Sequence, residues 1–257
     1  MPIIEINNKQ VHVQELNKGA KETVVLLHGM FSNLSVYYFN IAPLLAKEFH
    51  VVMYDLKSHG LSERVHEGYD LDSMVSDLHA LLQTLGHHSV HLAGYSFGGL
   101  IALKMAANFP EKVKKLLIIE APDPSDDKTR NIIDEYSKEF LEHYVTNFTD
   151  TTKVKMGKRQ MEKNHQMYEY LFHKTSIKTD MMREKSFFKS PEISTVSNET
   201  MVVYGTSSNC LEAGKSLQSK LKNATLVTVD GDHNIPIQAP TIVANTMHSF
   251  FSQKARA

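Results

Sequence analysis

HLAGYSFGG, residues 91–99, is the stretch that decides the fold. An apolar run enters Gly94-Tyr95-Ser96-Phe97-Gly98, and the apolar segment LIALKMAANF follows it at 100–109. G-x-S-x-G between a strand and a helix predicts a sharp, strained turn that exposes the serine, because only glycine leaves room two residues to either side. The bare five-residue pattern is more often an inert turn, but this strand-to-helix setting favours a nucleophile at Ser96.

The segments around this turn alternate between strand-like and helical patterns. Continuous apolar runs predict buried strands in TVVLL (23–27), HVVMY (50–54), SVHLAGYS (89–96) and KVKKLLIIE (112–120). Helical spacing is expected over 34–49, where Pro43 is an obstacle to a straight helix, and over 71–85. Residues 3–6 and 11–16 predict a hairpin at one edge of the sheet. Strands that alternate with helices predict an α/β fold with a mostly parallel central sheet flanked by helices.

The alternation stops at residue 121 and resumes near residue 199. Between these points only helical patterns occur, one over 132–148 and another over 161–172. We therefore expect a core formed by residues 1–120 and 197–257, with a helical cap, residues 121–196, inserted after the sixth strand. Met and aromatic side chains are frequent in this insertion and suit an adaptable apolar pocket.

Composition limits the classes of partner. The chain has 257 residues, a formal net charge of −1 and 42% hydrophobic residues, which suits one core and provides no overall field for nucleic acid or an anionic membrane. The single cysteine, Cys210, excludes an internal disulfide, and no apolar run approaches the ~20 residues of a membrane span. We expect a soluble, cytoplasmic protein that binds neither nucleic acid nor membrane; the oligomeric state stays open.

A serine nucleophile needs a base to accept its proton and donors to hold the negative charge that develops. His233, in GDHNIPIQAP after the last strand-like run, is the candidate base. His28 and His59 are interpreted as loop-bracing residues instead. The amide of Phe97, at the start of a helix, and the amide of Met30, in HGMFSN, are the candidate oxyanion donors.

Four motifs then stand in register. With H-G-M at 28–30, D-L-K-S-H-G-L-S at 55–62, G-Y-S-F-G-G at 94–99 and G-D-H-N-I-P at 231–236, the chain resembles the α/β-hydrolase fold superfamily over about residues 23–120 and 197–251. The similarity is to serine esterase-like and thioesterase-like members. Many members have Arg-Gly where this chain has Lys57-Ser58, which bears on loop packing. The resemblance implies a serine hydrolase that needs no cofactor and no metal.

Enzymes of this kind use a carboxylate to orient the histidine, which completes a serine–histidine–acid triad, and this acid is missing from its usual place. The resemblance implies an Asp in the turn after the strand at 200–204, but that turn is GTSSN, residues 205–209. Some members take the acid from the end of the preceding strand, which here ends in Glu120. A carboxylate that closes a buried apolar strand is costly unless it is paired, and the order Ser96, Glu120, His233 fits this fold. Glu120 is the predicted acid and Asp123 its rival.

The leading hypothesis is therefore hydrolysis of a carboxylic ester or thioester through an acyl-enzyme on Ser96. The expected partner is a small acyl substrate, and a carrier could present it because residues 153–163 hold five basic groups and one acidic group. Carbon–carbon bond hydrolysis by the same triad stays open, as does a non-catalytic receptor of the same fold. Epoxide hydrolysis and dehalogenation are disfavoured, since in this fold they use a carboxylate where Ser96 stands.

Overall fold

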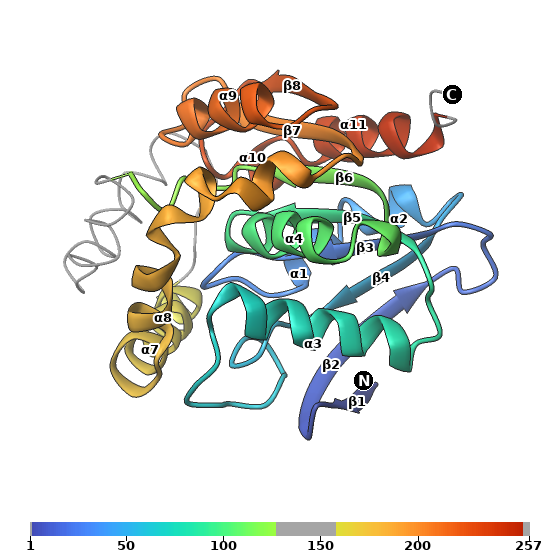
Figure 1. Ribbon diagram of the computed structural model, residues 1–257. Helices are drawn as coiled ribbons and strands as arrows, with labels where there is room; N and C mark the ends of the chain where they lie inside the picture. Colours follow the sequence, from blue (N-terminus) through green and yellow to red (C-terminus); the bar gives the residue numbers. More distant parts are fainter. Residues whose placement is uncertain (1, 127–157, 254–257) are drawn as a thin grey trace.

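The computed structural model describes residues 2–126 and 158–253 (Figure 1). These residues contain an eight-stranded sheet with the order β1-β2-β4-β3-β5-β6-β7-β8. The strands are β1 Ile3–Ile6, β2 Lys9–Leu16, β3 Thr23–Leu27, β4 His50–Tyr54, β5 Val90–Tyr95, β6 Val113–Ile119, β7 Glu199–Gly205 and β8 Ala224–Val229. Strands β3 to β8 pair in parallel, and the β1–β2 hairpin joins β4 antiparallel at one edge. The predicted mostly parallel sheet and its edge hairpin are confirmed.

Helices cover both faces of the sheet (Figure 1). One face packs on α3 Leu71–Thr84, α4 Phe97–Asn108 and α9 Leu211–Lys220, and the other on α2 Ala42–Leu45 and α11 Pro240–Ser252. Successive residues of a strand serve opposite faces, so Val25 and Leu27 join the first core and Val24 and Leu26 the second. All four are buried, which explains why β3 reads as an unbroken apolar run.

The helical pattern expected over residues 34–49 is interrupted before Pro43, the residue expected to prevent a straight helix. The chain forms two one-turn helices there, α1 Ser35–Tyr38 and α2 Ala42–Leu45. Pro43 has no amide proton with which to continue a helix from the carbonyl of Phe39, and its ring would clash with that carbonyl. Pro43 sits instead in the first turn of α2, where a missing amide proton costs nothing.

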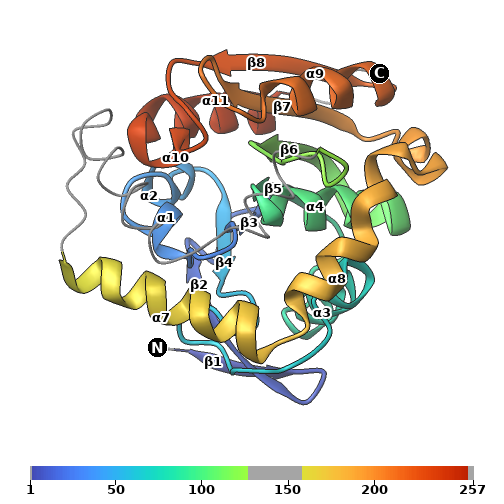
Figure 2. The same cartoon turned by 90° about the vertical axis from the view of Figure 1, so that its left-hand side faces the viewer.

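The described part of the insertion is helical. It contains α7 Lys158–Lys174, α8 Ile177–Arg183 and the short 3-10 turns Glu184–Lys189 and Pro191–Thr195. Figure 1 shows α7 and α8 beyond one end of the sheet, and Figure 2 looks at the molecule from that side. The Tyr69 amide donates to Asp180 at 3.0 Å, and the Ser176 amide donates to the carbonyl of His66 at 2.7 Å. The helical pattern expected over 132–148 and residues 153–157 of the basic run lie outside the described residues.

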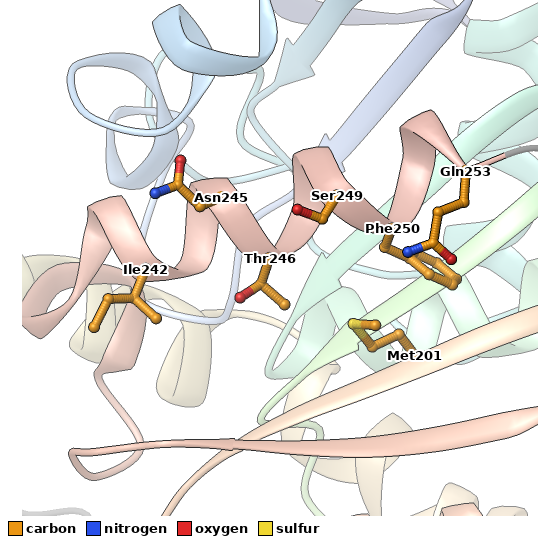
Figure 3. Close-up of a pocket in the computed structure, with 7 residues that line it drawn as sticks. All are labelled: Met201, Ile242, Asn245, Thr246, Ser249, Phe250 and Gln253. Atoms are coloured by element: carbon orange, nitrogen blue, oxygen red, sulfur yellow. The ribbon is translucent and has the colours of Figure 1, made fainter.

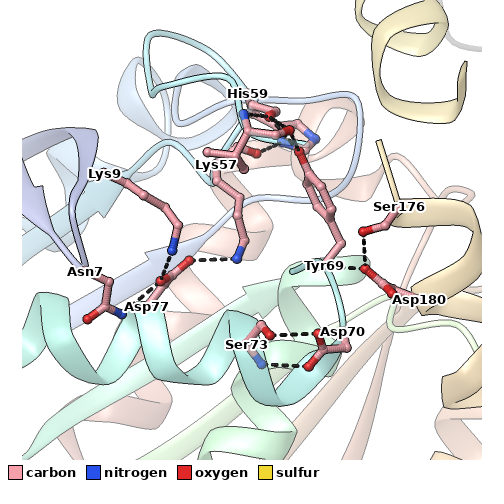
Figure 4. A network of polar contacts seen from close by, with 12 residues as sticks. Asn7, Lys9, Lys57, His59, Tyr69, Asp70, Ser73, Asp77, Ser176 and Asp180 are labelled. Carbon is pink, nitrogen blue, oxygen red and sulfur yellow. Dashed lines mark hydrogen bonds and ion pairs between the residues drawn. The ribbon is translucent and has the colours of Figure 1, made fainter. Parts of the chain in front are cut away.

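Lys57 and Ser58, which stand where many similar proteins have Arg-Gly, belong to a network of polar contacts (Figure 4). Buried Lys57 pairs with Asp77 of α3 at 2.8 Å, and Lys9 reaches the same carboxylate at 3.1 Å. Ser58 has φ +62° and lies 2.6 Å from the hydroxyl of Tyr69. These residues fasten the loop after β4 to α3 and, through Tyr69, to Asp180 of α8, which agrees with a role in loop packing.

In the parts of the chain that the structure describes, no helix combines the length and the apolar character needed to cross a membrane.

Candidate active site

Ser96 occupies a strained turn between β5 and α4. Its backbone has φ 53° and ψ −119°, a conformation that side chains rarely adopt. A Cβ on Gly94 would lie 2.1 Å from the carbonyl oxygen of Gly98, and a Cβ on Gly98 would lie 2.5 Å from the carbonyl oxygens of Leu27 and His28. The glycines of the motif are therefore required by close backbone approach. The turn is held by its amide, which donates to the carbonyl of Ile119 at 2.8 Å.

Three side chains singled out in the sequence meet in one hydrogen-bonded line. Nε2 of His233 lies 3.1 Å from Oγ of Ser96, and Nδ1 of His233 lies 3.1 Å from Oε2 of Glu120. They come from the turns after β5, β8 and β6, which all lie at the carboxyl edge of the parallel sheet. The geometry is that of a nucleophile, a base and an acid that orients the base.

Glu120 is fully buried, with 0% of its surface exposed, and has φ 55°. Its carboxylate accepts hydrogen bonds from the backbone amide of Gly205 and from the hydroxyl of Ser208, in addition to the contact with His233. Gly205 ends β7 and Ser208 lies in the turn that follows it, where the family most often carries its acid. The turn that lacks a carboxylate thus supplies donors to the carboxylate of the neighbouring strand, and these bonds offset the cost of its burial.

Asp123 lies in a local turn. Its carboxylate accepts the amide of Ser125 at 2.8 Å, and its carbonyl accepts the amide of Asp126 at 3.0 Å. The imidazole of His233 contacts Glu120 instead. The geometry therefore favours Glu120 over Asp123 as the partner of the histidine.

Cys210 is a neighbour of His233 that sequence reasoning missed. Its sulfur lies 3.6 Å from Nδ1 of His233, and its amide donates to Oγ of Ser208 at 3.0 Å. Burial lowers the pKa of His233, whereas hydrogen bonds and charge from Cys210 and Glu120 raise it, with a net rise from 6.5 to about 10. The surroundings of this ring therefore favour its protonated form, which is the form that it takes during acyl transfer.

The predicted oxyanion donors lie beside the nucleophile. The amide of Phe97 opens α4 and has no acceptor within its own helix. A Cβ on Gly29 would lie 2.9 Å from the Cβ of Ser96, so the loop that carries Met30 packs directly against the nucleophile turn. Within residues 2–126 and 158–253, neither amide donates a hydrogen bond to another group of the chain.

Two buried histidines fix this loop, in agreement with their expected structural role. His28 donates from Nδ1 to the carbonyl of Gly29 at 2.7 Å and accepts the amide of Leu56 on Nε2 at 2.9 Å. His59 accepts the amide of Phe31 on Nε2 at 3.3 Å. Burial lowers the pKa of both, that of His59 to about 3, so both rings are neutral when they make these contacts.

Aromatic side chains form a wall next to the Met30 loop. The Phe31 ring lies 5.4 Å from Phe172 and 6.0 Å from Tyr168, and the latter two stack at 5.0 Å. Tyr168 and Phe172 belong to α7, so the insertion reaches the carboxyl edge of the sheet. This aromatic group, which we call the α7 wall, consists of Phe31, Tyr168 and Phe172. The side chains of Met161 and His165, expected on the same helical face, lie outside the described residues, and His173 is exposed on the surface.

A hollow of about 380 Å³ lies elsewhere, between α11 and β7 (Figure 3). Met201 and Ile242 line it together with amide, hydroxyl and aromatic groups of α11 and its end. It contains none of the three converging side chains and no ionisable group, so it offers no chemistry of its own.

The comparisons with known proteins agree with the fold. The alpha/beta hydrolase fold family matches residues 22–240 of this chain, and the chain belongs to that family. It is 33% identical over 114 residues to the AB hydrolase superfamily protein YisY of Bacillus subtilis (strain 168), which covers 44% of this chain and 42% of that protein. It is 36% identical over 107 residues to a fluoroacetate dehalogenase of Burkholderia sp, covering 40% and 35%. The matched region thus spans less than half of each of these relatives.

Solved structures share the whole architecture. A hydrolase from Pseudomonas aeruginosa PA01 superposes with a TM-score of 0.82 at 17% identity over 98% of each chain. The enol-lactonase from Burkholderia xenovorans LB400 superposes with a TM-score of 0.76 at 19% identity, covering 98% of this chain and 100% of that one. At this identity the likeness establishes the fold alone.

Proposed function

We propose that this hydrolase-family protein is a serine hydrolase that cleaves a carboxylic ester or thioester through an acyl-enzyme on Ser96. The observation that carries the proposal is the line from Ser96 through His233 to buried Glu120, with 3.1 Å at each step. The strained backbone at Ser96 supports it, since such strain persists where the surrounding structure enforces it, as at active sites.

The first half-reaction forms the acyl-enzyme. His233 takes the proton of Ser96 on Nε2 as Oγ attacks the carbonyl carbon, and Glu120 stabilises the imidazolium through Nδ1. The amides of Met30 and Phe97 hold the oxyanion of the tetrahedral intermediate. His233 then gives its proton to the leaving alcohol or thiol as the bond to the acyl carbon breaks.

The second half-reaction releases the acid. A water molecule gives a proton to His233 and attacks the acyl carbon, the same two amides hold the second oxyanion, and the proton returns to Oγ of Ser96. No group outside the protein and water is required. A serine at position 96 favours acyl transfer over halide or epoxide chemistry, for which this fold uses a carboxylate nucleophile.

The α7 wall supports an apolar acyl group as substrate. Its three rings stand beside the proposed oxyanion loop, and aromatic faces bind apolar groups by burying large areas. Presentation of the acyl group by a carrier remains a second part of the proposal, motivated by the basic run at 153–163.

A fluorophosphonate probe tests the proposal, because it reacts covalently with an activated serine. We expect folded wild-type protein to be labelled on the peptide that contains Ser96, and Ser96→Ala to remain unlabelled. Ser219→Ala, an exposed serine of α9, is the matched control and should label as the wild type does. Absence of labelling in the folded wild type, or labelling that persists in Ser96→Ala, would favour a receptor. Parallel panels of p-nitrophenyl esters and acyl thioesters then identify the leaving group.

A further inference from the structure

Three potential metal ligands converge far from the proposed catalytic line. Glu15 lies on β2, His50 is the first residue of β4, and His87 lies in the turn after α3. One donor atom from each residue lies within 4.8 Å of the other two. Since β4 runs parallel to β5, the start of β4 is at the opposite end of the sheet from Ser96.

His87 has a buried ring nitrogen whose hydrogen-bonding capacity is unsatisfied. Its Nε2 is enclosed by protein and has no hydrogen-bond partner among the residues that the structure describes. A buried polar atom without a partner is unfavourable and rare in folded proteins. The His50 ring lies nearby, with ring centroids 5.2 Å apart, and His50 Nε2 is 2.9 Å from Oε2 of Glu15.

We propose that Glu15, His50 and His87 bind a divalent transition-metal ion of the zinc class, with His87 coordinating through Nε2. Two imidazoles and one carboxylate suit zinc, nickel or copper, whereas magnesium and calcium prefer oxygen ligands throughout. Three protein ligands leave one tetrahedral position for water. This site departs from the expectation of a metal-free protein.

The distances are close to those of a tetrahedral zinc site. Zinc bonds of about 2.0–2.2 Å place neighbouring nitrogen and oxygen ligands roughly 3.3 Å apart. Glu15 and His50 stand at 2.9 Å, and the widest separation in the group is below 4.8 Å, so a side-chain shift on the order of 1.5 Å completes the geometry. Lys18 holds the other carboxylate oxygen of Glu15 at 2.6 Å and so orients this ligand.

The protonation of His87 is compatible with this role. Burial lowers its pKa, the neighbouring His50 lowers it further, and Glu15 opposes them, with a net fall from 6.5. A neutral imidazole is the form that binds metal. The ion would join β2, β4 and the α3–β5 turn, and would therefore stabilise the fold without touching Ser96 or His233.

Zinc chloride added to tag-free protein tests the site. A second group of ligands, Glu120, Cys210 and His233, lies at the proposed active site. The measurements are therefore made in a Cys210→Ser background, which removes its thiol. We expect one zinc per chain by equilibrium dialysis and a saturable rise in Tm of about 5 °C at a zinc concentration 100-fold above Kd.

Variants separate this site from adventitious binding. His87→Ala and His50→Ala should each weaken zinc binding at least tenfold and abolish the rise in Tm, whereas His88→Ala, the exposed neighbour, should leave both unchanged. Circular dichroism without zinc establishes that each variant folds, and Glu15→Gln replaces any variant that does not. Undiminished zinc binding in folded His87→Ala or Glu15→Gln, or no binding by the parent protein, overturns the proposal.

Discussion

Replacing Glu120 by Gln keeps the shape of the side chain and removes its charge. In the wild-type protein the carboxylate stands 3.1 Å from Nδ1 of His233 and is shielded from water. The amide of glutamine can instead donate from its NH₂ group to Nδ1, which selects the tautomer with a lone pair on Nδ1 and the proton on Nε2. Nε2 can then no longer accept the Ser96 proton. We therefore expect Glu120→Gln to fold and to lose turnover.

The size of the loss follows from the geometry. Two unit charges 3.1 Å apart interact by roughly 5 kcal/mol at an effective dielectric constant of about 20. In enzyme whose His233 is neutral, this interaction arises only when the ring becomes an imidazolium. Its removal therefore lowers the kcat measured above pH 10, where wild-type His233 starts neutral, by about 10⁴-fold. The same order of loss accompanies replacement of the acid by its amide in a Ser-His-Asp protease.

The assay is the steady-state hydrolysis of a p-nitrophenyl ester or acyl thioester on which the wild type is active. Asp123→Asn is the matched control, because that carboxylate caps a local turn and should change kcat by less than about threefold. Circular dichroism and Tm establish that both variants fold. Retention of more than a tenth of kcat by folded Glu120→Gln, or loss of turnover in Asp123→Asn alone, would refute the reasoning.

Three further predictions concern the pH dependence of turnover, the pH dependence of stability and the packing of the nucleophile turn. Because a pKa of about 10 keeps His233 protonated at neutral pH, kcat/KM should rise as the pH increases toward 10. In Cys210→Ala, the inflection of the plot of kcat/KM against pH should lie at lower pH than in the wild type. Identical inflections would exclude a role for the thiol. The raised pKa also stabilises the fold below pH 6.5, and this contribution is lost as the pH rises through about 10. Gly98→Ala should lower the free energy of unfolding in urea by about 3 kcal/mol, since its Cβ would lie 2.5 Å from two carbonyl oxygens. Gly19→Ala, whose Cβ meets nothing within 4 Å, should change it by less than about 0.5 kcal/mol, and equal losses in the two variants would contradict the packing argument.

The succession of strands and helices along the chain, but not the order of the strands within the sheet, could be predicted from the sequence. Buried parallel strands are continuous apolar runs, and amphipathic helices such as α3 show a regular apolar face. The segment at 34–49 has apolar residues at helical spacing, and Pro43 indicates that one continuous helix cannot form, because it prevents the hydrogen bonds that such a helix needs.

The three converging side chains could be found because each follows a strand in a fixed order along the chain. Ser208 and Cys210 could not, because their role depends on which strands are neighbours in space. Strands β6 and β7 pair with Ile119 opposite Val203, and this register brings Ser208 to Glu120 across 88 positions of sequence. The available signal was a turn rich in hydroxyl groups beside a strand that ends in a buried carboxylate.

Nuclear magnetic resonance of ¹⁵N-histidine-labelled protein tests the contact between Glu120 and His233 most directly, without need of a substrate. A proton held between Nδ1 and a buried carboxylate is strongly deshielded and protected from exchange with water. We predict such a resonance in the wild type, in Ser96→Ala and in Asp123→Asn, and its loss in Glu120→Gln. A deshielded His233 resonance that is unchanged in Glu120→Gln, or is lost in Asp123→Asn, would contradict the assignment of Glu120 as the partner of this histidine.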